Sequence, residues 1–418
     1  MSDIHVDVVV VGAGPAGVAA GIGAREAGAG RVLVIERDWD LGGILQQCIH
    51  PGFGLHTFKE ELTGPEYMHR WVRWAHDAGV EFMTNTMVFG AYPDGSLDVM
   101  NPDRGVFRVS AGATLLAMGC RERPLGAVNI PGTRPAGIYT AGTAQRFVNM
   151  EGYMPGERAV IMGSGDIGLI MARRMIWEGA KVEAVFEIMP WAGGLRRNIA
   201  QCLDDYGIPF FLQHSVARVH GRDRLEGVTA VKVDDDRRPL PGSERFIPCD
   251  TLLLAVGLIP ENELSRMAGA QIHPVTGGPV INELYQTTCP SIFAAGNVVI
   301  VYDLADWVSQ EGMAAGRNAA LYATGRLQAP VRRIEIAGGA NVRLFSPHYI
   351  TGGTDATIYF RVNRPIEGRC RVFASHGLYE RRERYARPGE MNEVRLKKDA
   401  LAALPDGATR IVVDVEEA

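Results

Sequence analysis

A thiol and an imidazole stand two residues apart in the stretch LGGILQQCIHPGFG, residues 41–54, as Cys48 and His50. A thiolate is a nucleophile and a redox centre, and a neighbouring imidazolium lowers a thiol pKa. A free cysteine is more often simply a small buried residue. The stretch therefore leaves two interpretations of Cys48 open. His50 is likewise either a proton donor or a satisfied polar contact in a loop.

No second sulfur lies near Cys48 in the sequence. The six cysteines are scattered at positions 48, 120, 202, 249, 289 and 370, and none forms a C-x-x-C or C-x-x-x-x-C pair. Dithiol–disulfide exchange needs an attacking thiolate and a resolving sulfur. A zinc or iron–sulfur site needs clustered ligands. The sequence therefore argues against both kinds of chemistry.

Two glycine-rich turns give a stronger signal, because each follows an apolar β-branched run and opens a helical stretch. The spacing G-x-G-x-x-G occurs at Gly12, Gly14 and Gly17 and again at Gly163, Gly165 and Gly168. In a dinucleotide-binding βαβ unit the first glycine permits the turn, the second lets a pyrophosphate approach the backbone, and the third lets helix and strand pack closely. The helix N-terminus supplies N–H donors for the phosphates. The repeat predicts two dinucleotide sites.

An acidic residue stands nineteen positions after the third glycine of each turn, at Glu36 and at Glu187. A carboxylate there accepts hydrogen bonds from ribose hydroxyls and repels a 2′-phosphate, so Glu187 favours NAD over NADP. Arg196 and Arg197 follow and could reach a phosphate, which keeps NADP open. A further alternative is that the second dinucleotide site is vestigial and binds nothing or another adenine nucleotide.

Composition places the chain among globular proteins of several domains. Its 418 residues exceed one ordinary core and predict two or three domains. The 43 basic and 48 acidic residues form no like-charge block, which argues against nucleic acid and anionic membranes. The apolar run 8–24 is too broken by glycine and proline to span a bilayer, and the N-terminus lacks the basic region of a signal peptide. We expect a cytoplasmic protein.

The order of motifs resembles a known family. A G-G pair and the turn AMG at 117–119 follow the first fingerprint, and the turn AAGN at 294–297 follows the second. Over residues 5–328 this order is similar to the two-dinucleotide-domain flavoproteins, the pyridine nucleotide-disulfide oxidoreductase superfamily. The run TAGTAQ at 140–145 resembles flavoprotein subunits of opine oxidases, hydrogen cyanide synthase and heteromeric sarcosine oxidase. Residues 42–67 and 295–312 resemble flavoproteins that accompany glycerol-3-phosphate dehydrogenases.

The resemblance implies an α/β fold with two doubly wound, Rossmann-like domains. An FAD-binding domain would comprise residues 1–125 and 272–328, with an NAD(P)-binding domain, 126–271, inserted between its halves. Residues 329–418 lie outside the resemblance. Their short alternating runs, punctuated by Gly, Pro and Asn, predict a small β-rich C-terminal domain.

By the resemblance, FAD occupies the first fingerprint and a nicotinamide dinucleotide the second. The implied cofactor-binding residues are Gly12, Gly14, Pro15, Ala16, Gly17, Glu36, Arg37, Gly42, Gly43, Val88, Ala117, Met118, Gly119, Gly163, Gly165, Asp166, Ile167, Gly168, Glu187, Gly257, Gly296, Asn297 and Leu304. Cys48, His50 and Asp303 would lie near the isoalloxazine ring and are the candidate catalytic residues. An alternative interpretation of Asp303 is that its side chain caps the N-terminus of the following helix.

The missing cysteine pair separates this chain from the disulfide reductases that it resembles. We therefore expect an FAD-dependent oxidoreductase that transfers hydride between NAD(H) and flavin. It would exchange electrons with a small acceptor, a second copy in a homo-oligomer or a partner dehydrogenase subunit. Two alternatives stay open. One is a stand-alone NADH oxidase or peroxidase with Cys48 as a single redox thiol, and the other is a non-catalytic subunit that holds nucleotides.

Overall fold

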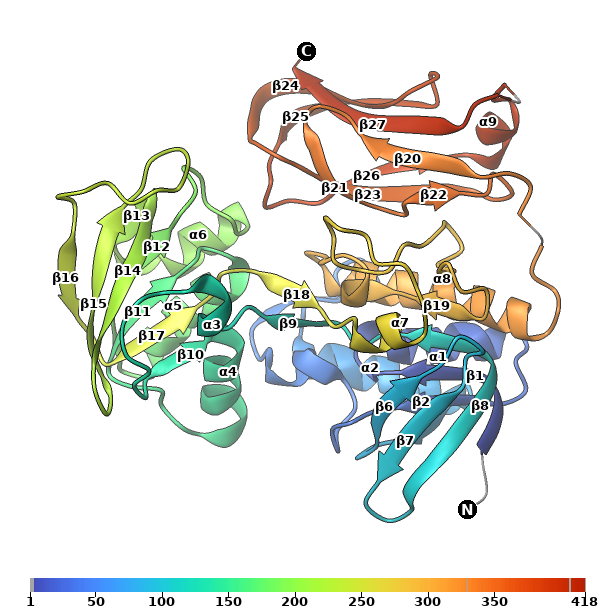
Figure 1. Ribbon diagram of the computed structural model, residues 1–418, viewed down its shortest axis with the longest axis horizontal. Coiled ribbons are helices and arrows are strands. Elements are labelled where there is room, and N and C mark those ends of the chain that lie inside the picture. Colours follow the sequence, from blue (N-terminus) through green and yellow to red (C-terminus); the bar gives the residue numbers. More distant parts are fainter. Residues whose placement is uncertain (1–3, 329, 406, 418) are drawn as a thin grey trace. The chain divides into compact units, whose positions relative to one another are not determined.

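The computed structural model describes residues 4–328, 330–405 and 407–417 and divides into two compact units (Figure 1). The first unit comprises Met1–Cys120 and Pro260–Ala418, and the second comprises Arg121–Ile259. The second unit is thus inserted into the chain of the first. Two short strands mark the connections, β9 (Cys120–Glu122) and β18 (Leu258–Pro260), and they pair with each other.

A seven-stranded sheet with the order β5-β2-β1-β8-β7-β6, and with β19 beside β8, forms the centre of the first unit. Its parallel strands are β1 (Ile4–Val11), β2 (Val32–Ile35), β5 (Glu81–Met83), β8 (Gly105–Leu116) and β19 (Ile292–Ala294). The antiparallel strands β6 (Met87–Ala91) and β7 (Leu97–Asn101) extend the sheet from β8. The valine run of β1 is buried, as expected for a strand covered on both faces.

Helices α1 (Pro15–Glu26), α2 (Gly64–Asp77) and α8 (Ala305–Ala323) accompany this sheet (Figure 1). Glycines allow α1 and α8 to touch along their backbones. A Cβ on Gly312 would lie 2.1 Å from the Ala16 carbonyl oxygen, and one on Gly316 would lie 1.9 Å from that of Ala20. The remaining short elements of this part are η1 (Gly43–Gln47), β3 (Pro51–Phe53), β4 (Leu62–Thr63), α7 (Glu263–Met267) and η4 (Gly296–Val298).

The second unit contains a five-stranded parallel sheet of order β10-β17-β11-β12-β13. Its strands are β10 (Ile138–Thr140), β11 (Arg158–Met162), β12 (Lys181–Glu187), β13 (Phe210–Leu212) and β17 (Thr251–Leu254). An antiparallel sheet consists of β14 (His214–Gly221), β15 (Leu225–Lys232) and β16 (Arg245–Pro248). The helices are α3 (Leu125–Val128), α4 (Ala141–Arg146), η2 (Phe147–Glu151), α5 (Asp166–Trp177), α6 (Arg196–Cys202) and η3 (Asp204–Tyr206).

Residues beyond 330 form two β-sheets with a hydrophobic core of their own, which includes Ile358, Phe360, Val372 and Val413. The sheet orders are β22-β20-β27-β24-β25 and β21-β23-β26. The elements are β20 (Ile334–Gly338), β21 (Val342–Ser346), β22 (Tyr349–Ile350), β23 (Ala356–Val362), β24 (Ile366–Ala374), β25 (Tyr379–Ala386), β26 (Asn392–Leu396), α9 (Lys398–Ala402) and β27 (Arg410–Glu417). The predicted α/β architecture with a C-terminal β part is confirmed.

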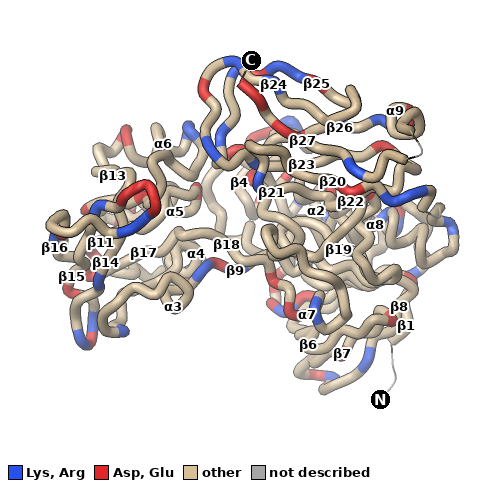
Figure 2. Tube along the Cα trace, turned by 45° about the horizontal axis from the view of Figure 1, so that its top comes forward, with Lys and Arg blue, Asp and Glu red and all other residues tan. Residues whose placement is uncertain are grey.

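Basic and acidic positions are interspersed along the chain (Figure 2). The charged run YERRERYA forms β25, an edge strand whose Arg and Glu side chains are largely exposed. Among the described helices, none combines the length and the apolar character that a bilayer crossing requires.

Candidate functional site

The first glycine turn connects β1 to α1. Gly12 has φ +98°, and a Cβ there would lie 2.7 Å from the Ala117 carbonyl oxygen. A Cβ on Gly17 would lie 1.8 Å from the Gly12 carbonyl oxygen. The fold itself therefore requires these two glycines. A Cβ on Gly14, in contrast, would meet no atom within 4 Å. The space in front of Gly14 is open, as the approach of a pyrophosphate requires.

The second turn, between β11 and α5, has the same construction. A Cβ on Gly163 would lie 2.1 Å from the Ala255 carbonyl oxygen, and one on Gly168 would lie 2.7 Å from the Ala255 Cβ. The nearest atom to a Cβ on Gly165 would be 3.8 Å away. In both turns, therefore, the middle glycine of the fingerprint is not required by packing and faces open space. We call each such opening a glycine cradle, the first at Gly14 and the second at Gly165.

The two acids hold the same position beside their turns. Glu36 accepts hydrogen bonds from the Ala13 amide at 2.7 Å and the Asp38 amide at 2.9 Å. Glu187 accepts from the Ser164 amide at 3.0 Å and the Met189 amide at 2.9 Å. A carboxylate offers about four lone-pair sites, so both acids keep acceptor capacity for ribose hydroxyls.

The G-G pair lies directly against the first cradle. The Gly42 amide donates to the Ala13 carbonyl oxygen at 2.8 Å, and a Cβ on Gly43 would lie 3.1 Å from the Gly14 Cα. Two further glycines follow the strands next to the turns: Gly119 after β8 and Gly257 after β17. A Cβ on either would meet no atom within 4 Å. Each unit therefore gathers its fingerprint glycines and its acid at the carboxyl ends of its parallel strands.

The remaining predicted cofactor residues have the following places. Pro15 and Ala16 begin α1, Arg37 is exposed after β2, Val88 is buried in β6, Ala117 and Met118 follow β8, Asp166 and Ile167 begin α5, Gly296 and Asn297 belong to η4, and Leu304 precedes α8. Asn297 accepts from the Tyr302 amide at 3.0 Å, and its side-chain nitrogen lies 3.6 Å from the Cys120 sulfur. Its amide therefore braces the turn before α8.

Ser164 is a site residue that the sequence pattern did not reveal. Its hydroxyl donates to Glu187 at 2.5 Å and accepts from the Gly193 amide at 2.8 Å. The Leu195 amide donates to Asp166 at 2.8 Å, so the second turn also holds the start of α6. Two exposed side chains, Arg196 and Arg197, begin that helix. The only signal in the sequence is that Ser164 is a polar residue between the first two glycines of the fingerprint.

Cys48 is buried at the end of η1, with 8% of its surface exposed and its sulfur 3.4 Å from the Ile44 carbonyl oxygen. Burial raises the pKa of this thiol to about 12, so it is protonated at neutral pH. The nearby His50 is half-buried, with Nδ1 3.0 Å from the Pro51 carbonyl oxygen and its ring 5.2 Å from that of Phe53. These surroundings favour the interpretation of Cys48 as a small buried residue.

Asp303 does not cap α8. The cap position is Leu304, and no side chain caps that helix end. Asp303 instead forms an ion pair with Arg361 of β23 and accepts a hydrogen bond from the Met391 amide at 2.6 Å. The capping interpretation is therefore wrong, because a guanidinium 58 residues away in sequence binds the carboxylate.

We expect Cys48→Ser to leave the reduction of bound flavin by NADH within about tenfold of the wild type, a barrier change of about 1.4 kcal/mol or less. A protonated thiol is neither a nucleophile nor a redox partner. Anaerobic titration with NADH measures both the rate and the electron uptake. An uptake of two more electrons per FAD in the wild type than in the variant would place Cys48 in a redox centre.

Two glycine cradles in separate Rossmann-like units, each with its own acid, define the class of two-dinucleotide-domain flavoproteins. A family model described as "Pyridine nucleotide-disulphide oxidoreductase" matches residues 6–324, and the chain belongs to that family. Its members are FAD- and NAD(P)-dependent oxidoreductases, which confirms the predicted enzyme class and cofactors. The open space at Gly14 and at Gly165 fits the pyrophosphates of these cofactors.

The chain is similar to the HcnB chain of hydrogen cyanide synthase from Pseudomonas protegens, with 26% identity over 75% of this chain and 69% of that protein. It is also 26% identical to one of the opine oxidase subunits of Agrobacterium tumefaciens, over 78% of this chain and 67% of the relative. Among solved structures, thioredoxin reductase of T. acidophilum superposes with a TM-score of 0.61. At 22% identity this match covers 77% of this chain and 98% of the reductase, and it shows a shared fold.

Proposed function

We propose that the protein transfers hydride between NAD(H) and a bound FAD and exchanges electrons with a small acceptor or a partner subunit. The observation that supports this most directly is the pair of glycine cradles, one in each unit. We assign FAD to the segments 1–125 and 272–328 and NAD(H) to the segment 126–271. Flavin supplies the hydride-accepting chemistry when it is bound.

The residues of the chain would bind and orient the two cofactors. Gly14 leaves room for the FAD pyrophosphate, and Glu36 would accept hydrogen bonds from the adenosine ribose. Gly165 and Glu187 would do the same for the nicotinamide dinucleotide. In this scheme Asp303 is a positioning residue, since Arg361 and the Met391 amide already engage its carboxylate.

Disulfide reduction is a poor alternative for this chain. None of the six cysteines stands in a C-x-x-C or C-x-x-x-x-C pair, so no resolving sulfur lies near another cysteine in the sequence. The high pKa of Cys48 also disfavours a peroxidase that uses this thiol alone. The named relatives are subunits of hydrogen cyanide synthase and opine oxidase, which supports electron exchange with a partner subunit.

We expect NADH to reduce the flavin at least about tenfold faster than NADPH, because the Glu187 carboxylate repels a 2′-phosphate. Glu187→Gln removes the charge and keeps the side-chain shape, so it should reduce the difference between the rates with NADH and with NADPH. Rapid mixing under anaerobic conditions, followed at the flavin absorbance band, measures both rates.

The matched control is Glu183→Gln on the same strand, which should leave the ratio unchanged. A wild type that clearly prefers NADPH would contradict the assignment of Glu187. Failure of NADH to reduce the flavin in any preparation would support the alternative of a non-catalytic subunit that holds nucleotides.

A further inference from the structure

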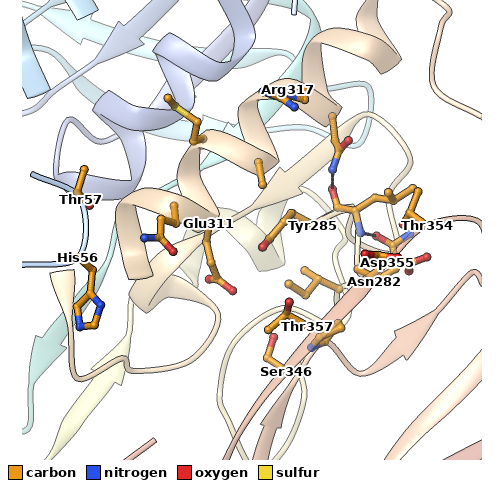
Figure 3. A pocket seen from close by; sticks show the side chains of 18 of the residues that line it. His56, Thr57, Asn282, Tyr285, Glu311, Arg317, Ser346, Thr354, Asp355 and Thr357 are labelled. Carbon is orange, nitrogen blue, oxygen red and sulfur yellow. Dashed lines mark hydrogen bonds between the residues drawn. The ribbon is translucent and has the colours of Figure 1, made fainter. Parts of the chain in front are cut away.

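A cavity of about 660 Å³ lies within the first unit, apart from both glycine cradles. Its walls are α2, the face of α8 from residue 310 to 318, the segment 281–285 and the C-terminal segment 346–357 (Figure 3). This volume is typical of sites for small organic ligands. The lining groups that have no partner within the protein indicate which kind of ligand the cavity can bind.

Three carboxyl groups line the cavity, and the protein already occupies two of them. Glu283 accepts hydrogen bonds from the Thr351 amide at 2.9 Å and the Thr351 hydroxyl at 2.5 Å. Asp355 is paired with the Lys397 ammonium at 2.8 Å and accepts from the Lys398 amide at 2.8 Å. Asp355 is therefore paired with a cation of the protein itself, and Glu283 is held by the Thr351 amide and hydroxyl.

The third carboxyl group, Glu311, points into the cavity from α8 (Figure 3). Only 5% of the residue is exposed, and burial raises its pKa to about 8; the Tyr302 hydroxyl and the Gly296 amide act in the opposite direction. The titratable groups that face it are the phenols of Tyr285, Tyr302 and Tyr359. At neutral pH Glu311 is therefore mostly an uncharged acid, which donates a hydrogen bond.

Two further lining side chains are hydrogen-bond donors. Arg317 is exposed at the cavity, and its guanidinium has no carboxylate partner among the described residues. The Asn282 side-chain oxygen accepts from the Leu284 and Gln286 amides, both at 3.0 Å, which fixes the amide orientation. Its nitrogen has no hydrogen-bond acceptor in the described chain. Among the described lining residues, Arg317 thus supplies a positive charge without a carboxylate partner, and Asn282 supplies a free N–H donor.

An aromatic wall completes the lining. The rings of Trp71 and Trp74 on α2 are stacked, with centroids 5.1 Å apart and an interplanar angle of 17°. Trp74 is the more exposed of the two. Its ring offers a flat apolar surface to a carbon skeleton.

We propose that this cavity binds a small organic carboxylate, which pairs with the Arg317 guanidinium while its carbon skeleton packs against the Trp71–Trp74 wall. A guanidinium matches the two oxygens of a carboxylate better than any neutral group does. Asn282, Tyr285 and Glu311 donate to further oxygens of the ligand. This site does not depend on the function proposed above.

The test uses three probes with the same ring and different charge: benzoate, benzylammonium and benzyl alcohol. We expect titration calorimetry of the flavin-containing full chain at neutral pH to show benzoate binding at least about tenfold tighter than either other probe. Arg317→Gln should remove this preference. Because the Arg317 side chain is exposed, we expect the variant to fold like the wild type. Arg384→Gln, an exposed arginine outside the cavity, is the matched control and should bind benzoate like the wild type.

A pH series supplies a second readout. Benzoate affinity should fall as the pH rises through about 8, because Glu311 then loses its proton and places a negative charge in the cavity. Glu311→Gln keeps a hydrogen-bond donor that does not titrate, so the benzoate affinity of this variant should depend less on pH. The proposal is overturned if benzylammonium binds more tightly than benzoate, if Arg317→Gln leaves benzoate affinity unchanged, or if no probe binds at about 10 mM.

Discussion

Gly14→Val is expected to give a folded protein that contains almost no flavin. The Gly14 backbone is extended, with φ −73° and ψ −172°, which valine adopts without strain. A Cβ there meets no protein atom within 4 Å, so the side chain extends into the space where the FAD pyrophosphate would approach. The FAD released per chain, measured by absorbance after denaturation, tests the loss. Circular dichroism tests the fold.

Gly165→Val is the matched variant in the second cradle. Its backbone is also extended, with φ −63° and ψ 158°. We expect this variant to keep its FAD and to lose reduction by NADH, because only the nicotinamide site is blocked. Stoichiometric FAD in Gly14→Val would exclude the first cradle as the flavin site. Loss of FAD from a folded Gly165→Val would show that the two cradles are assigned the wrong way round.

Arg361→Met is expected to destabilise the protein by about 3 kcal/mol. The Arg361 and Asp303 side chains are only 15% and 10% exposed, and the guanidinium also donates to the carbonyl oxygens of Val301 and Pro388, both at 3.2 Å. Removing it takes the Arg361 counter-charge away from a carboxylate that is only 10% exposed. Urea denaturation of both proteins gives the difference in the free energy of unfolding.

Two further variants make this measurement specific. Arg364→Met breaks a pair with Glu417 whose side chains are 53% and 64% exposed, and it should cost less than about 1 kcal/mol. The double variant Asp303→Asn with Arg361→Met should be more stable than Arg361→Met alone, since it no longer buries a charge. If Arg361→Met lowers the free energy of unfolding no more than Arg364→Met does, the Asp303–Arg361 pair does not stabilise the turn before α8.

The sequence by itself determined the two nucleotide units and much of their chemistry. Gly12, Gly14 and Gly17 lie within six residues, and Glu36 follows at a fixed distance, directly after the next strand. Such a βαβ unit is local in sequence, so spacing alone predicts which residues meet. The repeat at Gly163 to Glu187 predicted the second unit for the same reason, whereas its insertion between two halves of the first was implied by the family resemblance. The alternating runs after residue 330 were likewise enough to predict β-structure.

The tertiary structure decided the properties that depend on distant neighbours. The fingerprint assigns Gly12 to the turn and Gly14 to the pyrophosphate, but only the structure shows that Gly12 packs against Ala117, more than 100 residues away, while Gly14 faces open space. The burial that protonates Cys48, the pairing of Asp303 with Arg361 and the raised pKa of Glu311 also follow from surroundings assembled by remote segments. A residue's pKa and its partner depend on burial and on nearby charge, and folding brings those neighbours together from parts of the chain that sequence spacing does not relate.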